Sequence, residues 1–155
     1  MNLENKFYLT KNGLKKAKEE YRDLVELRKK KSKGDAPELL HSEELNPEYM
    51  SFLEDVELLE NRIADLDNVL KNYEIISPPS KEKRKEIHLG AKVSLEIDGE
   101  KDEFEIVGTF EANPSLGKIS DDSPVGKYLI GRKEGEEFIM SSAIKTSYKI
   151  KKIKY

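Results

Sequence analysis

Apolar side chains between Tyr49 and Tyr73 recur in alternating steps of three and four residues along the chain. This heptad pattern is carried by Tyr49, Phe52, Val56, Leu59, Ile63, Leu66, Leu70 and Tyr73. Such a pattern is typical of a helix that packs against a second helix along one narrow seam. The same steps occur upstream at Leu14, Ala17, Tyr21 and Leu24. The pattern therefore predicts two long helices that form an antiparallel coiled-coil hairpin.

Local signals at the helix ends favour a hairpin made by one chain. The hydroxyl of Thr10 can accept a hydrogen bond from the amides of a first helical turn, so we expect a helix over residues 11–33. Asn46-Pro47 suits the N-cap and first position of a second helix that reaches about residue 73. An intermolecular helix pair would share the heptad pattern. The helix break at residues 34–37 favours a fold-back, and hence a monomer.

The period of the pattern changes in the C-terminal half. Ser77-Pro78-Pro79-Ser80 cannot be helical and is typical of a linker. Beyond it, apolar residues alternate with polar ones at Val93, Leu95 and Ile97. Asp98-Gly99 then predicts a two-residue hairpin turn, and Ser123-Pro124 predicts a short helix over residues 125–129. We expect an α+β protein with a hairpin over residues 1–76, a linker over 77–87 and a small strand-rich domain over 88–155.

Composition agrees with an extended arm on a small core. Hydrophobic residues make up 36% of the chain and charged residues 38%, which is too polar for one large globule. The chain has no cysteine, which excludes disulfides and thiolate metal sites. No apolar stretch is long enough to span a bilayer, and the N-terminal residues lack a signal-peptide core. We therefore expect a cytoplasmic protein without a membrane partner.

Charge is segregated between the two predicted helices. Residues 11–33 hold ten Lys or Arg against four acids, whereas residues 34–74 hold twelve acids against two bases. Opposite charges beside a coiled-coil seam set the orientation and register of the helices. The basic cluster of Arg28, Lys29, Lys30, Lys31 and Lys33 has a second interpretation, contact with the phosphate backbone of RNA. The two interpretations are compatible.

Many short segments, in order along nearly the whole chain, resemble the bacterial Gre transcript-cleavage factors (GreA and GreB). The densest matches are Leu89-Gly90-Ala91-Lys92-Val93, Phe104-Glu105-Ile106-Val107-Gly108, Glu111-Ala112-Asn113-Pro114, Lys118-Ile119-Ser120, Asp122-Ser123-Pro124-Val125-Gly126, Leu129-Ile130-Gly131 and Gly135-Glu136-Glu137. In the N-terminal half, similar residues are Leu9-Thr10, Gly13, Glu48-Tyr49 and Arg62-Ile63.

This resemblance implies a coiled-coil hairpin followed by an FKBP-like domain. It implies a factor that docks on bacterial RNA polymerase, enters the secondary channel with its arm and acts on the 3′ end of backtracked nascent RNA. Such a factor has no cofactor of its own, shares a Mg²⁺ ion with the polymerase and is an accessory to cleavage rather than an enzyme. Asp122, Ser123 and Pro124 resemble the family loop that contacts the polymerase.

The carboxylates at the arm's tip depart from the family pattern. That pattern, Gly-Asp-x-x-Glu-Asn followed closely by Glu-Tyr, matches Asp35 and Glu38 in its first part. The Glu-Tyr pair, however, arrives later, and arms of equal length place the turn near Glu43 and Glu44. We expect Glu43 and Glu44 to assist the shared Mg²⁺, with Asp35 and Glu38 as the alternative pair. A further alternative is that all four are solvated loop acids. The protein would then regulate the polymerase through its channel without promoting cleavage.

Overall fold

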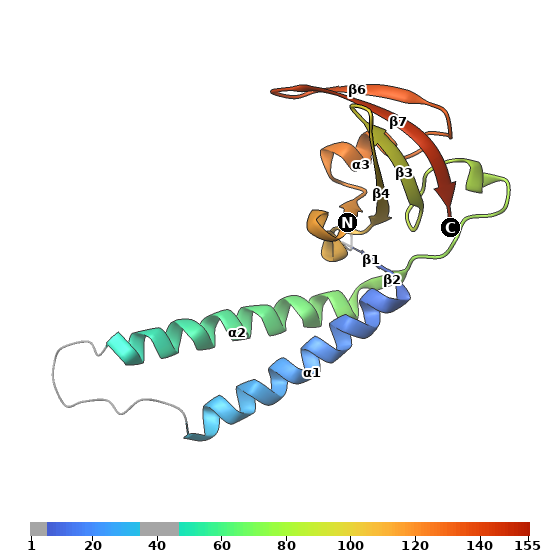
Figure 1. Cartoon of the computed structure of the whole chain (residues 1–155). Helices are drawn as coiled ribbons and strands as arrows, with labels where there is room; N and C mark the ends of the chain where they lie inside the picture. Colours follow the sequence, from blue (N-terminus) through green and yellow to red (C-terminus); the bar gives the residue numbers. More distant parts are fainter. Residues whose placement is uncertain (1–5, 35–46) are drawn as a thin grey trace, which may run out of the picture. The chain divides into compact units, whose positions relative to one another are not determined.

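The computed structural model describes residues 6–34 and 47–155 (Figure 1). The chain divides into two compact units. The helical unit is Leu14–Asn72. The globular unit combines the described residues up to Gly13 with Tyr73–Tyr155. In the described part of the chain, no helix is long and apolar enough to cross a membrane.

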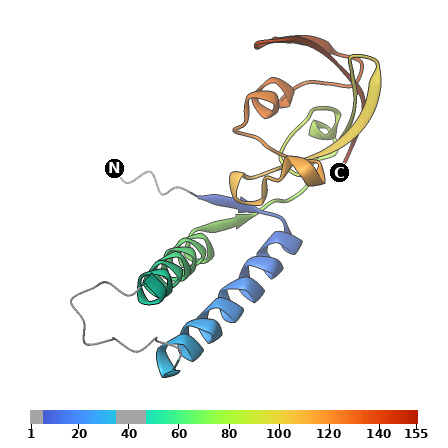
Figure 2. The ribbon, with the colours of Figure 1, turned by 60° about the vertical axis from the view of Figure 1, so that its left-hand side comes forward.

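Two long helices lie antiparallel to each other, as the heptad pattern predicts. They are α1 (Lys11–Gly34) and α2 (Pro47–Lys71), and Figure 2 shows them from a second direction. The most deeply buried side chains of the seam between them are Ala17, Leu59, Ile63 and Leu66, with Val69 beside them. Burial of one apolar stripe on each helix stabilises the hairpin, because most helical stability in proteins comes from such packing.

The predicted seam is wrong at its last position. Tyr73 is not on α2 but begins a short strand, β2 (Tyr73–Ile75), and its side chain is exposed. This strand pairs in parallel with β1 (Phe7–Leu9), with Leu9 opposite Ile75. The side-chain amide of Asn72 donates to the carbonyl and side-chain oxygens of Asn68, at 3.0 and 2.8 Å, and so caps the end of α2. The chain segments before α1 and after α2 therefore lie side by side.

The globular unit contains a five-stranded sheet in the order β5-β4-β3-β7-β6. Its strands are β3 (Lys92–Ile97), β4 (Glu100–Val107), β5 (Lys118–Ser120), β6 (Glu137–Ser141) and β7 (Lys145–Lys154). Within this five-stranded sheet as described, β4 and β5 pair in parallel and the other neighbouring strands pair antiparallel. The predicted hairpin turn is confirmed, because Asp98 and Gly99 join β3 to β4 with φ of 48° and 89°. Positive φ at both central residues is the condition of a type I′ turn.

One face of this sheet packs against α3 (Pro124–Leu129) to form the core. The alternating residues of β3 that the sequence predicts as apolar, Val93 and Leu95, are buried with Ile106, Leu129 and Ile150. Three single-turn 3₁₀ helices complete the unit: η1 (Lys83–Lys85), η2 (Thr109–Glu111) and η3 (Pro114–Leu116). The predicted α+β fold class is thus confirmed, with α3 one residue longer than expected.

The last residue, Tyr155, holds the segment between η1 and β3 against the sheet. Its hydroxyl accepts a hydrogen bond from the backbone N–H of His88 at 2.8 Å and donates one to the carbonyl of Glu86. Burial raises the pKa of the Tyr155 phenol, although the hydrogen bond from the His88 amide acts in the opposite direction. The neutral phenol is therefore the form that the folded state favours.

Tyr155→Phe is expected to lower the free energy of unfolding by about 1–2 kcal/mol at neutral pH, since two hydrogen bonds are lost. The native hydroxyl contributes fully below its unfolded pKa of about 10 and loses that contribution as the pH rises through the raised folded value. Urea unfolding of both proteins at about pH 8 and about pH 11 checks this. The difference between them should shrink at the higher pH, and a constant difference would contradict the assignment.

Candidate functional site

The free end of the hairpin is defined by where the two helices stop. Helix α1 ends at Gly34 and α2 begins at Pro47, and Figure 1 shows the end of α1 and the start of α2 at the same end of the antiparallel pair. The four predicted tip carboxylates are Asp35, Glu38, Glu43 and Glu44, and all lie outside the described residues. By sequence they fall between these two helix ends. Among the described residues, no group of three or more His, Asp or Glu side chains could hold a metal ion.

Ion pairs between α1 and α2 use the segregated charges. Arg62 donates two hydrogen bonds to the carboxylate of Glu20, from Nε at 2.7 Å and from Nη2 at 3.0 Å. This bonding raises the pKa of the Arg62 guanidinium. A two-point contact of this kind fixes geometry better than a single contact, because the planar guanidinium matches the planar carboxylate. The pair therefore fixes the register of one helix against the other.

The predicted RNA-contacting cluster divides into two groups. Arg28 pairs with Glu60 at 3.3 Å, and Lys31 lies 3.8 Å from Asp55 and over the ring of Phe52. These two cations therefore face α2 and serve the hairpin itself. The other three are exposed and form no ion pair with another described residue: Lys29, Lys30 and Lys33. The described contacts thus supply the interhelical pairing, and the RNA contact stays a prediction.

The predicted polymerase-binding loop is the entry to α3. Ser123 is the N-cap of this helix: its Oγ accepts from the Gly126 amide at 3.0 Å and donates to the Ser120 carbonyl at 2.7 Å. Gly126 is required here, because a Cβ would lie 1.9 Å from the Ser120 oxygen. Asp122 is exposed, and its carboxylate lies 2.9 Å from the Lys127 ammonium. Pro124 occupies the first turn, so the loop is rigid and presents one carboxylate to solvent.

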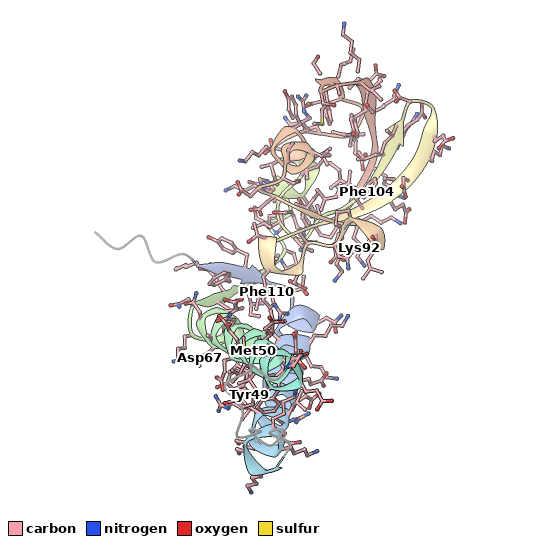
Figure 3. The ribbon with its side chains drawn as sticks, turned by 90° about the vertical axis from the view of Figure 1, so that its left-hand side faces the viewer. Tyr49, Met50, Asp67, Lys92, Phe104 and Phe110 are labelled. Atoms are coloured by element: carbon pink, nitrogen blue, oxygen red, sulfur yellow. The ribbon has the colours of Figure 1, made fainter. Side chains whose placement is uncertain are left out.

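Beside this loop is an apolar cavity of about 340 Å³, which we call the α3 cavity. It is lined by Leu95, Ile97, Phe104, Ala112, Pro114, Lys118, Ile119, Ser120, Ser123, Pro124, Val125 and Tyr148. Figure 3 labels Phe104 on β4, one of the lining side chains. The alternating apolar residues of β3 indicate only core in the sequence. The cavity has no signal in the sequence, because its lining comes from several strands and helices that no sequence pattern joins.

Comparison with known proteins places these features in a family. Residues 81–155 match the family model "Transcription elongation factor, GreA/GreB, C-term". Transcription elongation factor GreA of Thermomicrobium roseum is 35% identical over 130 residues, 83% of each chain. The GreA protein of Listeria monocytogenes serotype 4a is 36% identical over 165 residues, 99% of this chain and 98% of that one. The chain therefore belongs to the GreA/GreB family of transcription elongation factors.

A solved structure of GreA factor homolog 1 (Gfh1) from Thermus thermophilus is also similar. It is 25% identical in sequence and matches with a TM-score of 0.43 over 97% of this chain and 100% of that chain.

A double-mutant cycle on Arg62 and Glu20 tests their role in the hairpin. Both side chains are partly exposed, so we expect a coupling energy of about 0.5–1 kcal/mol from Arg62→Ala, Glu20→Ala and the double variant. Chemical unfolding of the four proteins measures it. The i,i+4 pair of Lys71 and Asp67 lies on one helix and is the matched control, with a smaller expected coupling. Equal coupling energies in the two cycles would reject the role in register.

Proposed function

We propose that this elongation factor stimulates the cleavage of backtracked nascent RNA by bacterial RNA polymerase. The observation that carries the proposal is the described hairpin. Its helices stop at one common end, and the sequence that joins them there is rich in carboxylates. The family membership supports the same proposal. The factor is an accessory, and the nuclease activity belongs to the polymerase.

The proposed chemistry uses carboxylates that complete a metal site owned by the partner. Hydrolysis of a phosphodiester by two metal ions requires both to hold the attacking and leaving oxygens. Mg²⁺ keeps several waters and is usually bound by only a few carboxylates. Glu43 and Glu44 would supply such ligands to the second, weakly held Mg²⁺ and orient the attacking water. Asp35 and Glu38 are the alternative pair.

The globular unit would dock on the polymerase through Asp122, Ser123, Pro124 and the adjoining α3 cavity. The exposed Asp122 carboxylate offers charge, and the cavity offers room for apolar side chains of the partner. Protein interfaces gain most of their energy from a few apolar or aromatic side chains that fill such pockets. On the arm, Lys29, Lys30 and Lys33 remain available for RNA phosphates within the channel.

The carboxylate assignment is tested with a polymerase complex stalled in the backtracked state. Glu43→Ala combined with Glu44→Ala should reduce RNA cleavage about 100-fold, because ligands of the metal are lost. Polymerase binding should be unchanged, since the proposed docking residues Asp122, Ser123 and Pro124 are left intact. Gel analysis of the 3′ fragments measures cleavage, and competition with labelled wild-type factor measures binding.

The matched control for this pair is Asp35→Ala combined with Glu38→Ala, which should leave the cleavage rate close to that of the wild type. The reverse outcome would assign the role to Asp35 and Glu38. If the wild-type factor binds the polymerase but produces no cleavage, the proposed function is wrong and the protein is a regulator that acts by occupying the channel.

The docking surface is tested with Ala112→Asp. Ala112 is exposed on the chain but lines the α3 cavity, so the carboxylate of the substituted aspartate would be buried among apolar side chains when the partner is bound. We expect polymerase binding to weaken about tenfold or more. Leu116→Asp is the matched control, because Leu116 is 70% exposed in the same segment and does not line the cavity. Equal affinities of the two variants would exclude the cavity from the interface.

A further inference from the structure

A carboxylate distant in sequence holds Thr10, the N-cap residue of α1. The backbone N–H and the hydroxyl of Thr10 both donate to the carboxylate of Glu111, at 2.6 and 2.7 Å. The Thr10 hydroxyl oxygen in turn accepts from the amide of Gly13 at 2.9 Å. This accepted bond confirms the predicted N-cap role of Thr10. The Glu111 cap, as we call this set of contacts, lies entirely within the globular unit.

Gly13 is part of the Glu111 cap because it leaves room for it. A Cβ at position 13 would lie 2.0 Å from Oε1 and 2.1 Å from Cδ of Glu111. Glycine is the least favourable residue in a helix apart from proline. Its presence in the first turn of α1 is therefore explained by the close approach of this carboxylate.

The setting of Glu111 makes its contacts strong. Its side chain is only 5% exposed, and the Lys118 ammonium lies 4.0 Å away. Hydrogen bonds to an ionised carboxylate are stronger than neutral ones, and the N-terminal end of a helix favours negative charge. Removal of the carboxylate would leave the Thr10 donors without their partner.

Glu111 also belongs to the segment that forms part of the α3 cavity. It is the last residue of η2, and the residues that follow it, Ala112, Pro114 and Lys118, line the cavity. Figure 3 labels Phe110, its neighbour in η2. One short segment therefore holds the first turn of α1 and forms a wall of the proposed docking surface.

We propose that Glu111 is a positioning residue for RNA cleavage. It holds the first turn of α1 to the segment that lines the α3 cavity, within the globular unit. This inference rests on the proposed function. Since small displacements of reacting groups are costly to a reaction, loss of the Glu111 cap should reduce cleavage even when the factor is fully bound.

The test is cleavage of backtracked RNA as a function of factor concentration. For Glu111→Ala, the maximal rate at saturating factor should fall about tenfold or more, with the half-saturating concentration within about twofold of the wild type. A variant that merely unfolds in part would show the opposite, a raised half-saturating concentration and an unchanged maximum. Glu134→Ala is the matched control, because the Glu134 carboxylate also accepts from a backbone amide, that of Ile153 at 2.8 Å.

Gly13→Ala provides a second, independent variant. The added methyl group should displace the Glu111 carboxylate and reduce the maximal rate as Glu111→Ala does. In the Glu111→Ala background the same methyl group has room, so the double variant should be no slower than Glu111→Ala alone. Additive losses in the double variant, or a maximal rate for Glu111→Ala equal to that of the wild type, would overturn the proposal.

A measurement without RNA separates this inference from the proposed function. The backbone amides of Thr10 and Gly13 report on the cap directly, because both are hydrogen-bonded within it. Their hydrogen exchange should become faster when Glu111→Ala is introduced and stay unchanged with Glu134→Ala. Faster exchange in a factor whose wild type does not stimulate cleavage would reject the proposed function and retain the cap. Unchanged exchange with Glu111→Ala would reject the cap's role.

Discussion

The parallel pairing of β1 with β2 is the contact on which the arrangement of the chain depends. It joins the segment before α1 to the segment after α2, with Phe7 opposite Tyr73 and Leu9 opposite Ile75, and the Ile76 amide adds a hydrogen bond to the Leu9 carbonyl at 2.8 Å. Two long helices that meet only along a seam would be free to separate at their ends. Pairing of the flanking segments joins the chain before α1 to the chain after α2 at that end of the hairpin.

The sequence predicted those elements whose determinants are local or periodic. The seam could be predicted because a heptad repeats over the length of α2, and the turn at Asp98-Gly99 because positive φ at both positions needs such residues. Tyr73 was assigned wrongly, since its spacing continues the heptad while its backbone begins β2. Strands of three residues carry too few positions for any period, so β1 and β2 were not expected.

Features that depend on distant residues escaped the sequence analysis for a physical reason. Thr10 was identified as a helix cap from its neighbours, but its partner Glu111 lies 101 residues away and belongs to a separate turn. The α3 cavity is formed by residues of four strands, two helical segments and two loops, and many of them also belong to the core pattern. The tip carboxylates were assigned by arm length and resemblance, and they remain predictions because they lie outside the described residues.

The closeness of β1 and β2 has a consequence for how such proteins can vary. Because the polypeptide leaves the sheet-containing unit at one point and returns beside it, everything from Leu14 to Asn72 is an insertion in topological terms. Insertions whose ends are adjacent are well tolerated, since the host fold keeps its own contacts. Helical hairpins of other lengths or charges could therefore replace this one while the globular unit keeps its fold. Residues of the globular unit and residues of the helical hairpin can therefore change independently in evolution.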